Sequence, residues 1–497
     1  MTTFTKIGLS LLLLSSLLGS CKKNFVSLNT DPDNPSTVTP GVILSQLQYR
    51  MVVTGVTTAR SFTHELMQMS APRISSDGLG VHRYYVTAAN GSSFWNSMYS
   101  YMNDIYDIYN ISDKLKENNY KAIALLYKCW AYSMLTDAFG DVPYSDAVKA
   151  SQGVLTPKFD AQKDIYTQIL QDLSTANDLL DPTKALTYGG DQLYGANALS
   201  GTSNPGIVKW KKFCNSMRLR LLLRLLRRDA ELNVSAQITA ILADPVKYPV
   251  FTSTADDAIF KFTGINPYFN PYYNARTLDW RQSDYYTSFF LDTLNINNDP
   301  RRSVWSTTVT VNGAPVYQGI GSGYDATVSY NVDANSSYSD GMKTLPQLGI
   351  MMTYAEEEFI KAELALKGFS TGHTPRNHYE NGIAASMTQW GVTLPANYLT
   401  QPNVLYDETA SEDTQLQQIM LQKYYALFFV DYQSWFEKRR TGYPILPRGA
   451  GIPATNPFPS RIPYPIYLQT LNAANLAAAV QAIGGSDNSS VKVWWDH

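Results

Sequence analysis

The sequence predicts a mainly α-helical fold in which pairs of helices carry long irregular loops and a few short β-hairpins. Three observations lead to this prediction. Apolar residues recur every three or four positions through several long segments, which is the periodicity of an amphipathic helix. Some of these segments follow one another after a short connection, as in an α-hairpin. Between about residues 244 and 346 the helical pattern stops, and short alternating patterns typical of strands replace it.

The first helix pair is predicted from about residue 93 to residue 140. In the first helix the apolar positions are Trp95, Met98, Met102, Ile105 and Tyr109. Ser92 or Ser93 is placed to cap its start. In the second helix the corresponding positions are Ile123, Leu126, Trp130 and Met134, and Gly140 follows its end. Because the two segments are closely joined, they should pack antiparallel.

Further helices are predicted at about 160–180, 205–228 and 352–366, and one long helix at 411–440. The third of these segments ends at a stop signal, Gly368. Paired helices of this kind suggest a tetratricopeptide-like stack, although the sequence holds no strict period of about 34 residues. A row of arginines on the 205–228 helix is expected to be a solvated face or a set of ion pairs. It comprises Arg220, Arg224, Arg227 and Arg228.

The long region at about 244–346 contains one strong hairpin signal. Asn312-Gly313 stands between alternating residues in the segment "TTVTVNGAPVYQ". Both residues tolerate the positive φ angles that a two-residue hairpin turn requires. Loops as long as this region are usually functional when they occur inside a compact domain. We therefore expect the ligand region to lie here.

The N-terminus predicts export and a lipid anchor. Lys6, an apolar run over 7–18 and the small residues Gly19 and Ser20 have the order of a secretory signal over residues 1–20. The run is shorter than the roughly 20 apolar residues of a membrane-spanning helix. The tetrapeptide "LGSC" resembles the lipobox of bacterial lipoproteins, so we predict that Cys21 is lipidated. Residues 21–36 would form a tether, and 37–497 a single domain. The alternative is a plain signal with an incidental cysteine.

Composition narrows the class of ligand. The chain has a net charge of −2 and no basic run, so a nucleic-acid partner is not expected. It has 34 tyrosines and only 16% charged residues, which favours a neutral, polar ligand, since tyrosine combines a stiff ring with a hydroxyl. Cys129 and Cys214 lie in apolar helical patterns and are predicted to be buried free thiols, although an exported chain could form a disulfide. No cofactor or metal site is predicted.

Several segments, taken in order, resemble the SusD/RagB family, outer-membrane lipoproteins of Bacteroidetes, and its second subgroup in particular. They are "LNTDPDNPSTVTP" after the cysteine, "TDAFGDVPYSDA" at 136–147, "KWKKFCNSMRLRLLLR" at 209–224, "NNDPR" at 297–301, "YAEEEFIKAELALKG" at 354–368, "QSWFEKRRTGYP" at 433–444 and "RIPYP" at 461–465. The chain departs from the family pattern in two places. Leu468 stands where an acidic residue is common, and Lys22 and Lys23 replace the acidic residues that favour export to the cell surface.

The resemblance implies a tetratricopeptide-like scaffold, anchored in the outer membrane by its N-terminal lipid and facing the cell surface. Such a protein forms the lid of a SusC-like TonB-dependent transporter and binds a nutrient, commonly an oligosaccharide. A peptide ligand and a mainly structural lid are the alternatives, because peptide-binding members of the family are known. An enzyme is not expected. The segment "HELMQ" at 64–68 lacks the second histidine of a zinc protease, and Asp256 and Asp257, the pair a glycosidase could use, are sequence neighbours that point apart.

Two aromatic segments are the candidate ligand sites. Between Gly264 and Phe290, 9 of 27 positions are aromatic. Rings can stack on sugar faces while amides and guanidinium groups bind hydroxyls. The predicted ligand-binding residues here are Tyr268, Tyr272, Tyr273, Arg276 and Trp280. In the second segment, 80–95, where family members often contribute binding residues, they are Tyr84, Tyr85, Asn90 and Trp95. The alternative is that these rings pack loops on helices, and Trp95 at the start of a helical stripe fits the core equally well.

Overall fold

The computed structural model describes residues 38–497. The predicted signal peptide, Cys21 and the tether 21–36 lie outside this range. The longer helices are α3 (Pro40–Thr58), α5 (Ala88–Leu115), α6 (Asn118–Phe139), α7 (Gln162–Leu179), α8 (Pro205–Arg224), α10 (Val234–Ala243), α14 (Tyr354–Leu366), α15 (Pro375–Gln389), α16 (Glu412–Ala426) and α19 (Ala473–Ala482). The shorter helices are α4 (His64–Leu66), α9 (Asp229–Leu232), α11 (Thr277–Trp280), α12 (Ser288–Asn295), α13 (Arg302–Trp305), α17 (Gln433–Thr441) and α18 (Leu468–Leu471).

The strands are short and form three antiparallel pairs within the described residues. β1 (Ser70–Pro72) pairs with β3 (Asp284–Tyr286), β2 (Ala258–Phe260) with β6 (Gly349–Met352), and β4 (Val309–Val311) with β5 (Ala314–Val316). The β4–β5 hairpin confirms the prediction at Asn312-Gly313, whose φ angles of 50° and 81° are both positive.

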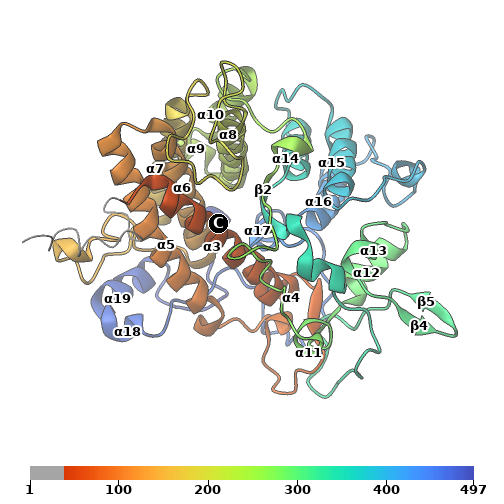
Figure 1. Cartoon of the computed structure of the whole chain (residues 1–497). Coiled ribbons are helices and arrows are strands. Elements are labelled where there is room, and N and C mark those ends of the chain that lie inside the picture. Colours follow the sequence, from red (N-terminus) through yellow and green to blue (C-terminus); the bar gives the residue numbers. More distant parts are fainter. Residues whose placement is uncertain (1–37) are drawn as a thin grey trace, which may run out of the picture.

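Consecutive helices pack on one another, as expected of a helical stack. α3 packs on α5, α5 on α6, α6 on α7, and α7 on α8, while α14 packs on α15 and α16. Figure 1 shows α5 to α8 on one side of the molecule and α14 to α16 on the other, with the loops around α11 at the lower end. The mainly helical fold with few short strands is therefore confirmed.

The predicted first helix pair is confirmed, but its start is earlier than expected. The face of α5 that carries Met98, Met102 and Ile105 is buried. α5 begins at Ala88 with Thr87 as its N-cap, so neither Ser92 nor Ser93 caps it. Asn90 completes a capping box, because its Oδ1 accepts a hydrogen bond of 2.8 Å from the Thr87 backbone N–H.

The prediction of a single long helix at 411–440 is wrong. This segment forms two helices, α16 and α17, which residues 427–432 connect. Phe429 and Asp431 have φ angles of 64° and 24°, and a right-handed α-helix cannot continue through positive φ angles. The turn buries the ring of Phe428 and is held by Thr63, whose hydroxyl donates to the Asp431 carbonyl over 2.7 Å. Core packing overrides the helical periodicity here.

A helix that the sequence analysis did not identify runs continuously from Pro40 to Leu66. It comprises α3, a π-helical segment Ala59–Thr63 and α4. The wider π-helical turn changes which side chains face the interior, and such turns recur at functional sites. His64 is buried just after it, with its Nδ1 2.8 Å from the Tyr338 hydroxyl and its Nε2 accepting from the Phe429 backbone N–H. This histidine is therefore an internal hydrogen-bonding group.

Two further predictions concern buried polar side chains. Cys129 and Cys214 are buried and free, as predicted. Three arginines of the row form ion pairs, and those of Arg220 and Arg224 are buried, while that of Arg228 with Glu231, at 3.2 Å, is more exposed. Arg220 lies 2.5 Å from Glu356, and Arg224 lies 2.5 Å from Asp137, and all four side chains are almost completely buried.

Candidate functional site

Three loops lie together at one end of the molecule, around α11 in Figure 1. They are residues 73–87, 264–283 and 321–335, and we call their exposed surface the loop face. The β1–β3 pair sets the first two loops side by side. Arg73 joins all three, because its guanidinium donates to the carbonyls of Gln282 and Tyr330, each over 3.0 Å. The loops are thus held in a fixed arrangement by hydrogen bonds between them.

Part of the aromatic segment 264–290 surrounds a cation. The guanidinium carbon of Arg60, from the π-helical segment, lies 4.5 Å from the ring centre of Trp280, 4.9 Å from that of Tyr338 and 5.2 Å from that of Tyr272. Its Nη2 also pairs with Asp284 at 3.1 Å. Cation–π contacts of this kind are stronger when they are shielded from water. Aromatic rings of this segment therefore stabilise the positive charge of Arg60.

Two of the predicted ligand-binding residues, Trp280 and Tyr272, are packed around Arg60. Trp280 is completely buried, and its Nε1 donates to the Ser339 carbonyl over 3.0 Å. The expectation that its ring offers an open stacking face does not fit this structure, because Arg60 and Tyr338 cover it. Tyr272 is half-buried against Trp280, with ring centres 4.7 Å apart.

Three other predicted residues are also in packed positions. Tyr84 is 6% exposed, and its ring packs on Phe458. Trp95 is 4% exposed and packs on Phe139, so its place in the core matches the alternative interpretation. Tyr268 is half-buried at the edge of the core.

Four predicted residues are exposed. Tyr85 and Tyr273 are 42% and 45% exposed, and Tyr273 stacks on Phe269 with ring centres 4.8 Å apart. Arg276 forms an exposed ion pair of 2.7 Å with Asp279. Asn90 is exposed but engaged in the capping box. Tyr85 and Tyr273 belong to different loops, and among residues 38–497 no ring contact joins them, so the loop face presents them as separate rings.

The role of Asn90 can be tested directly. We expect Asn90→Ala to lower the free energy of unfolding by about 0.5–1 kcal/mol, because it removes one partner of the capping box. Chemical denaturation followed by circular dichroism measures this change. If the variant is as stable as the parent, Asn90 does not contribute to the cap.

Two kinds of catalytic site, a metal cluster and the carboxylate pair Asp256 and Asp257, are not assembled in the described part of the chain. Between residues 38 and 497 no three His, Cys, Asp or Glu side chains meet as metal ligands would. Asp256 and Asp257 do point apart, since Asp256 pairs with Lys212 at 2.8 Å and Asp257 accepts from the Tyr354 backbone N–H. Their carboxyl groups do not face each other across a common space.

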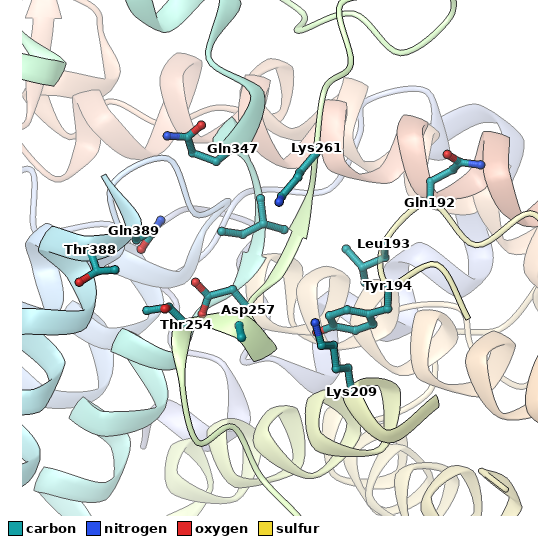
Figure 2. Close-up of a pocket in the computed structure, with 12 residues that line it drawn as sticks. Gln192, Leu193, Tyr194, Lys209, Thr254, Asp257, Lys261, Gln347, Thr388 and Gln389 are labelled. Atoms are coloured by element: carbon teal, nitrogen blue, oxygen red, sulfur yellow. The ribbon is translucent and has the colours of Figure 1, made fainter. Parts of the chain in front are cut away.

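A cavity of about 620 Å³ is lined by none of the residues of the loop face and was not found from the sequence. Figure 2 shows its walls, which come from the loop before α8, from α8 itself, from the 3₁₀ turn Thr254–Asp256 with β2, from the 3₁₀ turn Pro346–Leu348, and from the end of α15. Its charged residues are Lys209, Asp257 and Lys261. No short motif could have indicated this site, because its residues come from five separate parts of the sequence.

A comparison with known protein families identifies the family of this chain. A SusD-like family model described as "Starch-binding associating with outer membrane" matches residues 32–465. The chain belongs to the SusD-like family. Carbohydrate binding and association with the outer membrane are properties of this family. Within residues 38–497, no helix combines the length and the apolar character needed to cross a bilayer.

Solved structures show the same fold. A SusD homologue of Bacteroides fragilis is 24% identical, with a TM-score of 0.76 over 93% of this chain and 99% of its own. A protein of Bacteroides vulgatus is also 24% identical, with a TM-score of 0.77 over 93% and 100%. A chitin-binding SusD homologue of Flavobacterium johnsoniae is 24% identical, with a TM-score of 0.75 over 91% and 98%. A comparison with curated proteins gave no match.

Proposed function

We propose that this SusD-like protein is an outer-membrane lipoprotein that captures an oligosaccharide nutrient at the cell surface and delivers it to a SusC-like TonB-dependent transporter. The observation that carries the proposal is the family match over residues 32–465, with its description as starch-binding. A chitin-binding relative of the same fold supports a glycan as the ligand class. The protein binds its ligand without transforming it.

The loop face is the proposed place of capture. Tyr85 and Tyr273 expose ring surface there, and the CH groups of a sugar can stack on such rings. Phe269 holds the Tyr273 ring by stacking, so less conformational freedom is lost when a ligand binds. Arg276 and Asn274 lie in the same exposed segment and can bind hydroxyl groups.

The ligand class can be tested with a panel of immobilised glycans and peptides that includes starch and chitin oligosaccharides. We expect the purified protein to be retained by at least one glycan, without release of shortened products. Retention by peptides alone would favour a peptide ligand, and absence of retention by the whole panel would favour a mainly structural lid. Release of products would contradict a role restricted to binding.

The partner can be tested independently of the ligand. We expect an affinity-tagged version of the protein, extracted from outer membranes in mild detergent, to bring down a large barrel transporter. Mass spectrometry of the co-purified material identifies it. If no transporter co-purifies under conditions that preserve other outer-membrane complexes, the proposed delivery step is contradicted.

A further inference from the structure

The cavity of Figure 2 contains a buried polar side chain that lacks a partner. Gln389, at the C-terminal end of α15, is 8% exposed and lines the cavity. Neither its Nε2 nor its Oε1 forms a hydrogen bond with any of residues 38–497. A buried amide without partners is costly, so such a group calls for an explanation. A ligand hydroxyl, which both donates and accepts, satisfies both atoms at once.

Two lysines of the cavity are also free of carboxylates. Lys209 comes from α8 and Lys261 follows β2, and neither forms an ion pair within 4.0 Å among the described residues, although the charge of Lys209 acts to lower the pKa of Asp257. Figure 2 shows both side chains directed to the part of the cavity where Asp257 lies. The Lys209 ammonium is 6.0 Å from the ring centre of Tyr194. Two positive charges and one carboxyl group on the same cavity suit a ligand with a single negative charge.

The carboxyl group of Asp257 fits this arrangement. Its Oδ1 accepts a hydrogen bond of 2.6 Å from the Tyr354 backbone N–H, which fixes its orientation. Burial raises the pKa of Asp257 to about 7, so at neutral pH the group is partly protonated and can donate a hydrogen bond. A partly neutral Asp257 repels an anion less than a full carboxylate does.

The walls of the cavity are fixed before any ligand binds. Asp191, which is 2% exposed, accepts from the backbone N–H groups of Leu193 and Ala196 and from the indole of Trp210, over 2.8–3.0 Å. It thereby holds the loop that carries Tyr194. The Tyr194 hydroxyl donates to the Asp256 carbonyl over 2.8 Å. A cavity of about 620 Å³ lies within the usual size range of small-molecule sites, and its fixed walls lower the cost of binding.

We propose that this cavity is a second binding site, separate from the loop face, and that it takes a small hydroxylated monoanion of the sugar-acid class. The ligand carboxylate lies between Lys209 and Lys261, and its hydroxyl groups bind Gln389 and Asp257. The second site gives the protein selectivity for acidic sugars, which the two exposed tyrosines of the loop face do not provide by themselves.

Calorimetric titration of the full chain in detergent tests this proposal, with glucuronate as the probe and glucose and glucose 6-phosphate for comparison. We expect glucuronate to bind at least ten times more tightly than glucose, which lacks the charge, and more tightly than glucose 6-phosphate, which carries two. Absence of glucuronate binding at millimolar concentration overturns the proposal, as does equal binding of glucose. Tighter binding of glucose 6-phosphate rejects the sugar-acid class.

Substitutions show whether the binding occurs in this cavity. Lys261 is exposed, so Lys261→Met should fold normally and weaken glucuronate binding at least tenfold. Gln389→Leu should weaken it as well. Lys114→Met, at an exposed lysine of α5, is the matched control and should have no effect. Glucuronate binding that survives Lys261→Met unchanged overturns the assignment. Tyr273→Ala, a substitution on the loop face, should leave glucuronate binding unchanged. Loss of glycan binding at the loop face is therefore distinguishable from loss of glucuronate binding in this cavity.

Discussion

Glu437→Gln is expected to lower the free energy of unfolding by about 3–5 kcal/mol, because it breaks a buried network of charges. Glu437 in α17 lies 2.6 Å from Arg440, 3.0 Å from Lys423 and 3.9 Å from Arg224. Lys423 is 1% exposed, and Glu437 is its one ion-pair partner among residues 38–497. The glutamine has nearly the same shape as the glutamate but leaves this ammonium buried without a counter-charge.

The network spans five helices, α6, α8, α14, α16 and α17, which is why the effect should be global. Arg440 also binds Glu363 of α14 in a bidentate pair of 2.5–2.6 Å, and Arg224 of α8 binds Asp137 of α6. Together these residues provide three cations and three carboxylates within the described part of the chain. Removal of one negative charge leaves the set unbalanced among side chains that are at most 7% exposed.

The expected pH dependence follows from the pKa of Glu437. Burial acts to raise this pKa, but the charges of Arg440, Lys423 and Arg224 outweigh burial and hold it well below the usual value of 4.5. A depressed pKa in the folded state stabilises the protein above pH about 4.5, and this contribution is lost as the pH falls further. The difference between the parent and Glu437→Gln should therefore shrink below pH 4.5.

Denaturant titrations of parent and variant measure both effects. Glu380→Gln is a suitable control, because Glu380 forms a more exposed pair of 2.8 Å with Arg376 on α15. Pairs of that kind contribute at most about 1 kcal/mol. A loss for Glu437→Gln no greater than that of the control would contradict the structural role assigned to the network.

Cys21→Ala is expected to release the protein from the membrane almost completely. The proposed anchor is a set of acyl chains on this cysteine, and stable attachment requires at least two such chains. Residues 38–497 provide no helix that could replace the anchor by crossing the bilayer. Fractionation of cells that express the variant should find it in the soluble periplasmic fraction, while the parent stays with the outer membrane. Retention of the variant in the membrane fraction would contradict lipidation at Cys21.

The sequence predicted the elements whose local pattern agrees with their final packing. The helices around Met98 and Leu126 carry one apolar face each and form the expected pair, and Asn312-Gly313 forms the expected turn. The break at 427–432 was missed because it depends on Thr63 and His64, which are distant in sequence. The ordered family segments were sufficient to identify the family.

The candidate site was harder to predict, because a sequence does not distinguish an aromatic side chain that packs in the core from one that binds a ligand. Trp280 and Tyr272 surround Arg60, a partner about 200 residues away, and no local pattern reveals this contact. Tyr85 and Tyr273 are instead exposed, which their local sequence does not reveal either. The Gln389 cavity depends on five segments that only the folded chain brings together.

The central claim is that the loop face binds the nutrient, and one measurement tests it most directly. The glycan best retained in the panel is titrated calorimetrically into the parent and into the double variant Tyr85→Ala/Tyr273→Ala, with Tyr188→Ala, another tyrosine that is 40% exposed, as the control. We predict that the double variant loses at least tenfold in affinity, about 1.4 kcal/mol, while the control binds as the parent does. Equal affinity of the double variant and the parent would contradict the account.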